Sequence, residues 1–303
     1  MTAQERTDWL KRRQTGIGGS DVAAILGLSH FKTPLEIYES KIEEVPTESH
    51  GPLLEWGHRL EPVIRQAYSD ATGLSVVTPE KTFRSEEHPF MIADVDGICS
   101  DGRILEIKTA RTSLGWGEPG TDEIPEQYLT QVQHYMTVLN ARLCDVAVLI
   151  GGSDFRIYTV MDDPELATLL IREEAAFWEK VQKRTPPAPR TYEEAQQLFP
   201  TSRSNNIEAS ADIFQKAETL VSLKKNLDDL KKEIDSLQAD VTGYMAENDT
   251  LTFNGTPIAT WKTSKGRKSF SSTAFAKDHP DLYSQYLVEG TPSRRFLLKI
   301  KKD

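Results

Sequence analysis

Two carboxylates that could bind a metal ion lie in one short stretch, residues 94–109, close to a lysine. Polar and apolar residues alternate at both ends of this stretch, and Ser100-Asp101-Gly102 interrupts them, which predicts a β-hairpin. A three-residue loop with Gly102 in the left-handed conformation would set Asp96 directly opposite Glu106. A two-residue turn would place Asp96 on the wrong face, so we expect the three-residue loop.

The residue types on this hairpin favour metal-dependent chemistry at a phosphodiester. Glu106 and Lys108 are two apart and therefore share one face of a strand, while Leu105 and Ile107 point into a core. Facing carboxylates repel each other unless a positive charge lies between them, which suggests a divalent cation with oxygen ligands. Lys108 could hold an attacking water or a phosphate. The alternative is a surface strand that carries these residues only for solubility, and the neighbouring motifs have to decide.

A second candidate site is the glycine-rich turn Gly16-Ile17-Gly18-Gly19-Ser20, which follows Arg13. It leads into an apolar segment that ends at Gly27, and this pattern predicts a helix with Ser20 as its N-cap. A glycine turn at a helix N-terminus presents free N–H groups and suits an anion such as a phosphate. The alternative is an ordinary capped helix, which a lone turn of this kind indicates more often.

Two predicted helices carry further polar candidates. Residues 51–72 form an amphipathic pattern in which Glu61 lies beside the apolar stripe, either as a partly buried ligand or as a boundary residue. Residues 126–139 form a second such pattern, with Gln131 and Gln133 flanking its apolar side. Spacing alone does not separate the roles of the two glutamines.

The order of these elements predicts an α/β domain over residues 1–189, with a mixed β-sheet flanked by helices. Pro186-Pro187-Ala188-Pro189 ends this domain. In residues 190–303, apolar residues alternate spacings of three and four along a helical arm of about 208–247, which is typical of heptad positions. The arm would pair with a second helix of its own chain or with a neighbouring subunit. A hairpin around Asn254-Gly255 and a basic tail follow.

Composition limits the functional classes. The 303 residues are 38% apolar, carry a net charge of −10, and include only Cys99 and Cys144 as cysteines. That charge argues against non-specific coating of nucleic acid, although Trp261 to Asp303 is basic, with ten Lys or Arg against four Asp or Glu. Two cysteines and six scattered histidines argue against a disulfide framework and a zinc site. Without an apolar N-terminal run or a stretch of 18 apolar residues, we expect a cytoplasmic protein without signal peptide or membrane span.

Taken in order, the motifs resemble the phage exonucleases of the YqaJ and lambda exonuclease type, which belong to the PD-(D/E)xK nuclease superfamily. The resemblance covers roughly residues 5–185. Its motifs are Arg13, Gly-Gly-Ser20, Trp-Gly-x3-Glu61, Asp-Gly97, Glu-x-Lys108 and Gln-Val-Gln133. Each motif is weak alone, but their order and spacing together are specific. The resemblance implies a restriction-endonuclease-like α/β core of the PD-(D/E)xK type.

The resemblance also implies a site and a reaction. By this resemblance, a 5′-terminal phosphate would be held by Arg13 and Ser20, and Mg²⁺, or Mn²⁺ in its place, would be held by Glu61, Asp96 and Glu106. The attacking water would be oriented by Lys108, and the scissile region would be contacted by Gln131 and Gln133. Asp96 matches the family's aspartate better than Asp94, because it precedes Gly97 and lies ten residues before Glu106. Family members degrade one strand of duplex DNA from a 5′ end and leave a 3′ overhang.

Partners follow from the same resemblance. Double-stranded DNA ends would be the substrate, and a phage single-strand annealing protein would receive the remaining strand. The lambda-type enzyme is a ring of three subunits, so we expect a homo-oligomer, encoded by a phage or prophage and located in the bacterial host cytoplasm. Two alternatives stay open: a RecB-type or repair endonuclease with the same sheet, and a non-catalytic DNA-binding phage protein. The helical arm and basic tail are not needed by the nuclease core.

Overall fold

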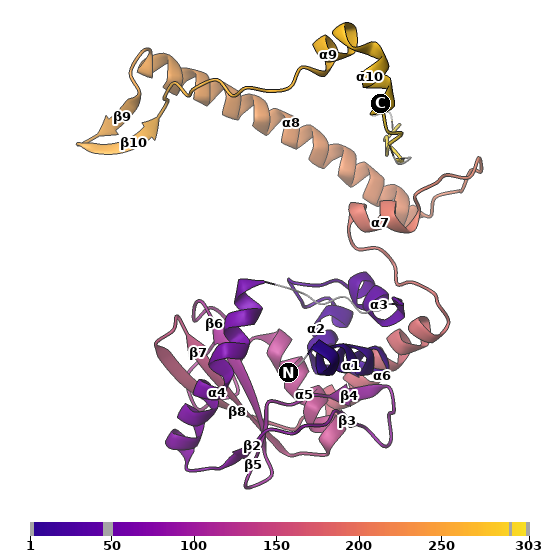
Figure 1. Cartoon of the computed structure of the whole chain (residues 1–303), viewed down its shortest axis with the longest axis vertical. Coiled ribbons are helices and arrows are strands. Elements are labelled where there is room, and N and C mark those ends of the chain that lie inside the picture. Colours follow the sequence, from indigo (N-terminus) through magenta and orange to yellow (C-terminus); the bar gives the residue numbers. More distant parts are fainter. Residues whose placement is uncertain (1–2, 45–50, 291–292, 301–303) are drawn as a thin grey trace. The chain divides into compact units, whose positions relative to one another are not determined.

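The computed structural model describes residues 3–44, 51–290 and 293–300 (Figure 1). The chain divides into two units, Met1–Ala195 and Gln196–Asp303. Among the described residues, no helix is long and apolar enough to cross a membrane.

A five-stranded mixed sheet forms the centre of the first unit. Its strands, in spatial order, are β2 (Val76–Val77), β5 (Gly97–Cys99), β6 (Ile104–Ala110), β7 (Leu143–Ile150) and β8 (Asp154–Met161). Only β6 and β7 run parallel, and the other neighbours are antiparallel. Most residues of the two parallel strands are buried, as expected for strands with helices on both faces. A smaller sheet of β1 (Ile17–Gly18), β4 (Met91–Ala93) and β3 (Phe83–Arg84) lies in the same unit.

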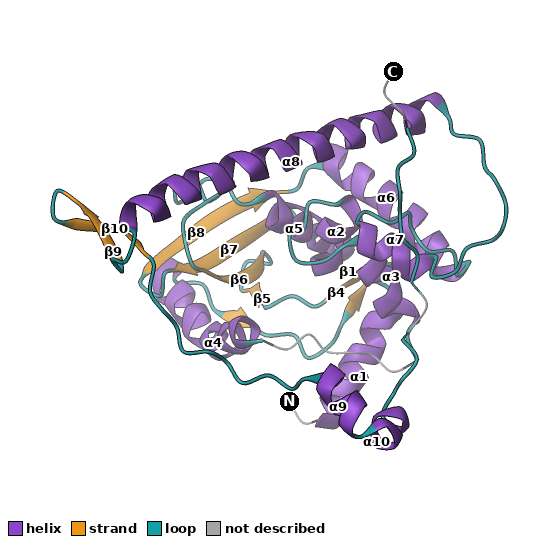
Figure 2. Ribbon diagram, turned by 90° about the horizontal axis from the view of Figure 1, so that it is seen from above, coloured by secondary structure: helices purple, strands orange, loops and turns teal. Residues whose placement is uncertain are grey.

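Helices cover both faces of the larger sheet (Figure 2). The helices of the first unit are α1 (Ala3–Gln14), α2 (Gly19–Leu26), α3 (Pro34–Ile42), α4 (Pro52–Thr72), α5 (Glu126–Leu139), α6 (Pro164–Gln182) and α7 (Tyr192–Leu198), which ends in the second unit. On one face, Ile64 and Tyr68 of α4 pack on Leu105 and Ile107. On the other face, α5 packs on Ile104 and its neighbours. Because side chains alternate along a strand, Glu106 and Lys108 share the α5 face.

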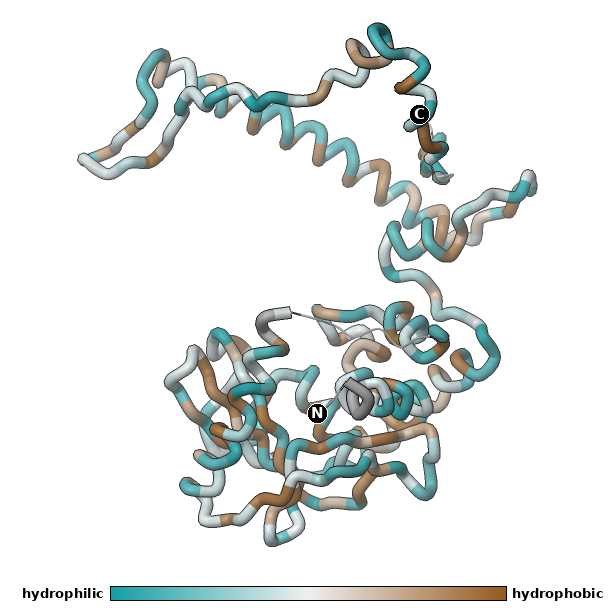
Figure 3. Tube along the Cα trace, viewed as in Figure 1, coloured by the Kyte–Doolittle hydropathy of each residue, from teal (hydrophilic) through white to brown (hydrophobic). Residues whose placement is uncertain are grey.

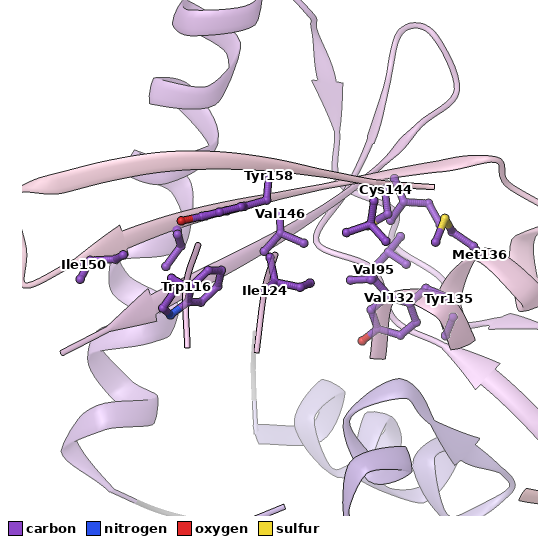
Figure 4. Close-up of a cluster of buried hydrophobic side chains, with 14 residues drawn as sticks. Val95, Trp116, Ile124, Val132, Tyr135, Met136, Cys144, Val146, Ile150 and Tyr158 are labelled. Carbon is purple, nitrogen blue, oxygen red and sulfur yellow. The ribbon is translucent and has the colours of Figure 1, made fainter. Parts of the chain in front are cut away.

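The core on the α5 face also includes the loop that precedes α5. Figure 4 shows Trp116 and Ile124 of this loop beside Val146 and Tyr158 of the sheet. The rings of Trp116 and Tyr158 lie 5.2 Å apart, and the Tyr158 hydroxyl donates to the carbonyl of Gly117. This packing fixes the loop on the α5 face of the sheet, against its edge strand β8.

The first unit ends at Ala195, beyond the proline-rich segment that the sequence suggests as the boundary. Arg190 lies against Gly27 so closely that an added Cβ on this glycine would meet its Nη1 at 1.5 Å. Glu194 is buried, and it accepts a hydrogen bond from the backbone N of Arg190 at 2.6 Å. These contacts tie residues 190–195 to the C-terminal end of α2.

The second unit contains α8 (Ala211–Met245), a hairpin of β9 (Thr250–Phe253) and β10 (Thr256–Thr260), and two short helices, α9 (Ser272–Asp278) and α10 (Pro280–Gln285). The hairpin turn has positive φ at Asn254 (49°) and Gly255 (78°), which confirms the Asn-Gly turn. The expected helical arm is confirmed as a helix of 35 residues, and the mixed α/β fold of the first unit is confirmed as well.

Candidate active site

The predicted hairpin register is confirmed. Gly97 pairs with Leu105 and Ile98 pairs with Ile104, and the next pair in this register is Asp96 with Glu106. Gly102 has a φ of 89°, so the loop is the three-residue type with glycine in the left-handed conformation. The two carboxylates therefore face each other on the α5 side of the sheet.

Glu106 is the most buried acid of this site, with 2% of its surface exposed. Its Oε1 accepts hydrogen bonds from Lys108 Nζ at 2.5 Å and from Gln131 Nε2 at 2.7 Å. Its Oε2 is buried and has no hydrogen-bond partner among the described residues. A buried carboxylate oxygen without a partner is costly. A cation at this oxygen would relieve that cost.

Burial and the pairing with Glu106 change the pKa of Asp96. Burial raises its pKa well above the ordinary value, and the facing Glu106 raises it further; Lys108 and the backbone N–H of Ile107 only partly oppose this. The Ile107 N–H donates to Asp96 Oδ2 at 2.8 Å, which fixes the carboxylate on the hairpin. Two acids held together in this way suit a hard divalent cation.

Lys108 remains an ammonium ion at this site. Burial lowers its pKa, but Glu106 and Asp96 outweigh burial, so the pKa of Lys108 is raised overall. Its Nζ also contacts Gln131 Oε1 at 3.1 Å and lies 4.9 Å from the centre of the Tyr128 ring. A charged lysine can orient water or a phosphate oxygen, but it has no free lone pair with which to accept a proton.

Asp96 and Glu106 fit a magnesium ion as a pair. Among the residues that the structure describes, no three His, Cys, Asp or Glu side chains converge to hold a metal ion. Mg²⁺ commonly uses one or two carboxylates and completes its shell with water and substrate phosphates. The orphaned Glu106 oxygen and the oxygen-only donor set therefore match such an ion, with an incomplete protein shell.

Glu61 has a different partner. It forms an ion pair with Arg65, one helical turn further along α4, and Arg65 Nη2 also donates to the backbone carbonyl of Asp96 at 3.2 Å. Glu61 is still close enough to contribute to the raised pKa of Asp96. The structure thus places Glu61 beside the carboxylate pair, connected to it through Arg65.

The two glutamines of α5 are separated by the structure. Gln131 lies at the carboxylates and also donates to the Tyr135 hydroxyl at 3.0 Å. Gln133 uses both ends of its amide elsewhere: Nε2 donates to the carbonyl of Met161 at 2.7 Å, and Oε1 accepts from the backbone N of Asp163 at 3.0 Å. The structure does not bring Gln133 to the candidate site; it joins α5 to the end of β8.

Arg13 and Ser20 are brought together at the N-terminus of α2. Arg13 Nη2 donates to Ser20 Oγ at 2.7 Å and to Asp21 Oδ1 at 3.0 Å. The N-cap is Gly18, so the predicted capping role of Ser20 is wrong: the backbone N of Gly18 donates to Asp21 Oδ2 at 3.0 Å. The Ser20 side chain therefore does not cap the helix, and its exposed hydroxyl lies next to the Arg13 guanidinium.

A buried ion pair behind this pocket was not expected from the sequence. Lys41 Nζ donates to Asp21 Oδ2 at 2.6 Å and to the carbonyl of Arg13 at 2.8 Å. Burial raises the pKa of Asp21, but Lys41 and Arg13 reverse this and hold the pKa well below its usual range. Asp21 could have been found as the acid three residues after the cap, as in a capping box. Nothing in the sequence pattern points to Lys41.

The pocket and the carboxylates are linked by close packing of α2 on α5. A Cβ on Gly19 would lie 2.5 Å from Tyr135 Cε1 and 3.0 Å from the carbonyl of Gln131, so only glycine fits. The Tyr135 hydroxyl in turn accepts from Gln131, which binds Glu106. Tyr135 is thus a further site residue, and its place four residues after Gln131, on the same side of the helix, can be read from the sequence.

Asp94, the other acid of the hairpin strand, has a structural task. Its two carboxylate oxygens accept from Trp9 Nε1 at 3.1 Å and from the Thr82 hydroxyl at 2.7 Å. It therefore connects α1 to the strand before the hairpin.

Comparisons with known proteins agree with this arrangement of motifs. Residues 8–142 match the model of the YqaJ-like viral recombinase domain. The chain is 32% identical over 305 aligned positions to the uncharacterized protein YqaJ of Bacillus subtilis (strain 168), covering 97% of this chain and 94% of the relative. The chain belongs to the YqaJ family.

Two solved structures are similar to this chain with lower sequence identity. An alkaline exonuclease from Laribacter hongkongensis aligns with a TM-score of 0.49 and 18% identity, over 59% of this chain and 93% of that chain. A phage related exonuclease from Haemophilus somnus 129PT aligns with a TM-score of 0.43 and 17% identity, over 56% and 94%. At these values neither match assigns a function to this chain.

Proposed function

We propose that this protein is a Mg²⁺-dependent deoxyribonuclease that degrades one strand of duplex DNA from a 5′ end and leaves a 3′ single-stranded overhang. The observation that carries the proposal is the pairing of the half-buried Asp96 with the buried Glu106, with Lys108 and Gln131 on the same Glu106 oxygen. Solubility does not account for a glutamate that is 2% exposed with one unpaired oxygen.

The residues of the site would divide the work. Asp96 and Glu106 would hold Mg²⁺, which when bound supplies electrostatic stabilisation of the phosphate and of the attacking water. Lys108, fixed by Glu106 and Gln131, would orient that water or a non-bridging phosphate oxygen as a charged donor. Glu61 would adjust the charge of the site through Arg65.

A preference for DNA ends is supported by the pocket at the N-terminus of α2. Arg13 and Ser20 offer a guanidinium, a hydroxyl and the positive end of a helix, a combination that suits the doubly charged phosphate at a 5′ end. Gly19 packs α2 directly on α5 beside Gln131, so the pocket and the carboxylates belong to one rigid arrangement. Groups that suit a terminal phosphate favour a nuclease that acts at DNA ends over an endonuclease.

The proposal extends to partners. A single-strand annealing protein would take up the 3′ overhang, as the family description of a viral recombinase suggests. Mn²⁺ would replace Mg²⁺, because both accept oxygen ligands. The site of action would be the cytoplasm of a bacterial host.

The test is digestion of linear duplex DNA that carries either a 5′-phosphate or a 5′-hydroxyl, in Mg²⁺ or EDTA. We expect loss of one strand only with Mg²⁺, and faster loss from the phosphate. Lys108→Ala should reduce the rate by about 10²–10³-fold, the usual effect of removing one charge-stabilising group. Lys183→Ala, which removes an equally charged but exposed lysine on the same unit, is the matched control.

The outcomes separate the remaining alternatives. Cutting of closed circular DNA, with equal rates from both kinds of end, would show an endonuclease with the same metal site. Arg13→Ala and Ser20→Ala should abolish the preference for the phosphate and leave cleavage of the hydroxyl end nearly unchanged. No cleavage under any condition would leave a DNA-binding protein.

A further inference from the structure

Apolar residues recur at regular intervals along the α8 tube (Figure 3), and their spacing places them on one face of the helix. The row alternates spacings of three and four and consists of Leu220, Leu223, Leu227, Leu230, Ile234, Leu237, Val241 and Tyr244. The seven from Leu223 to Tyr244 are each 43% to 81% exposed. Such a row on a helix of five heptads marks a surface made to be covered.

The row is narrow, and its width identifies the kind of partner. A helix that packs on a globular core has a wide apolar face that includes position e or g. In α8, position e holds Lys224 and Lys231, and position g holds Glu233 and Asp240. Between Leu223 and Tyr244 every e and g position is polar or charged, so the apolar row there is the a and d seam of a coiled coil. The partner is therefore another long helix.

We propose that the seam of α8 pairs with the seam of α8 from a second copy of this chain, as a parallel two-stranded coiled coil. Within the described part of the second unit, the other complete helices, α9 and α10, have seven and six residues and are too short to cover the row from Leu220 to Tyr244. The buried helices of the first unit already have their faces occupied by its sheet. A second α8 supplies a seam of matching length.

Charge favours the parallel orientation. In parallel register, position g faces position e five residues further along the partner, which pairs Asn226 with Lys231 and Glu233 with Gln238. No like charges meet. In an antiparallel pair with full overlap, Lys231 would face Lys231 and Glu233 would face Glu233 across the axis. Both contacts would be repulsive.

The residue types at positions a and d favour a coiled coil of two helices. The a positions of the C-terminal half are β-branched, Ile234 and Val241, while the d positions before them are Leu230 and Leu237. This combination is typical of parallel dimers. The pairing differs from the three-subunit ring that the family resemblance implies. It does not depend on nuclease activity.

The first test is the mass of the full-length protein by light scattering after size-exclusion chromatography. We expect twice the chain mass of 34.1 kDa, and a single chain mass for the double variant Leu230→Glu, Leu237→Glu. The control, Lys225→Glu with Lys232→Glu, places the same side chains on the opposite face and should remain a dimer. A wild-type monomer or trimer, or a seam variant of unchanged mass, would overturn the proposal.

The second test fixes the orientation by oxidative cross-linking. Leu223→Cys alone should form a covalent dimer, because the parallel register brings the two copies of residue 223 together. An antiparallel pair would cross-link only when Leu223→Cys is mixed with Val241→Cys. In a parallel pair those two positions lie about 27 Å apart along the axis. Cys99 and Cys144 are buried, and the unsubstituted chain under the same oxidant measures their background.

Discussion

Gln131 and Gln133 acquire different tasks although they are two positions apart on one helix. Residues at this spacing point to different sides of an α-helix. Gln131 faces the sheet, where its amide holds both Glu106 and Lys108. Gln133 faces the chain that leaves β8 and binds two backbone groups there. One glutamine therefore lies at the candidate site, and the other joins two elements of the fold.

Alanine substitutions should separate these tasks. Gln131→Ala removes one partner each from Lys108 and from Glu106 Oε1, which keep their bond to each other, so we expect a lower cleavage rate with a smaller loss of stability than in Gln133→Ala. Gln133→Ala leaves the carbonyl of Met161 and the N–H of Asp163 without their partner, and should lower the free energy of unfolding by about 1–3 kcal/mol. Its folded fraction should cleave at the wild-type rate. Urea unfolding and initial rates on the same preparations measure both effects.

Each variant is the control for the other. Equal losses of rate in both would mean that Gln133 also acts at the site, as the resemblance alone suggests. A large loss of stability in Gln131→Ala would mean that its bonds to Glu106 mainly hold the fold together.

The site was partly predictable, and the reason is local geometry. A loop length and one glycine fix the register that sets Asp96 opposite Glu106, and both can be counted in the sequence. Asp21 and Lys41 are 20 residues apart, and their ion pair depends on how α2 and α3 pack. No periodicity encodes such a contact. The separation of the two glutamines needed the position of β8, which is likewise a tertiary fact.

At the scale of elements, α5 joins the two candidate sites. Gln131 and Tyr135 connect it to the carboxylates and to α2. His134 connects it to the smaller sheet: Nε2 is 2.9 Å from the carbonyl of Ile92, and Nδ1 is 2.9 Å from Glu174 Oε1 on α6. A carbonyl can only accept, so a histidine that also donates to the carboxylate must be the doubly protonated imidazolium.

This buried pair should make stability depend on pH. Burial lowers the pKa of His134, but Glu174 outweighs it, with help from the Ile92 carbonyl and Asp21, so the pKa is raised above its ordinary value. The stabilisation is therefore complete below pH 6.5 and is lost as pH rises through the folded-state value. His134→Gln should cost about 3–5 kcal/mol near pH 6, since it leaves Glu174 buried and unpaired.

Urea unfolding of wild type and variant from pH 6 to pH 9 checks this. The difference between the two should shrink as pH rises. His58→Gln, which changes an exposed histidine on α4, is the control and should have little effect at any pH. A difference that is constant, or that grows toward pH 9, would show that His134 is not held as an imidazolium.

The elements themselves were well predicted where a periodic pattern and its end signals agree. The helix from residue 52 to 72 ends at Gly73 in the left-handed conformation, and α5 spans the expected residues. The start of α2 was misplaced because its N-cap is Gly18, a residue without a side chain that could signal a cap. Asp21, three residues further on, accepts from the backbone N of Gly18, while Arg13 binds the Ser20 hydroxyl.

At the scale of the whole chain, the segment after Pro189 contains the boundary between the two units, which lies after Ala195. The first unit includes Arg190, packed against Gly27, and Glu194, whose carboxylate binds the backbone of Arg190. A chain that ended at Pro189, the boundary suggested by the proline-rich segment, would lack both Arg190 and Glu194. The position at which the chain is cut should therefore decide how stable the isolated first unit is.

Chains that end at Ala195 and at Pro189 test this prediction. We expect the longer chain to fold alone, to keep Mg²⁺-dependent cleavage, and to be monomeric because it lacks α8. The shorter chain should be less stable by about 1–3 kcal/mol, since Gly27 and the end of α2 lose their cover. Thermal unfolding compares the two, and Arg190→Ala in the longer chain isolates the guanidinium. Equal stabilities would mean that residues 190–195 only rest on the surface, and a dimeric longer chain would place an assembly contact in the first unit.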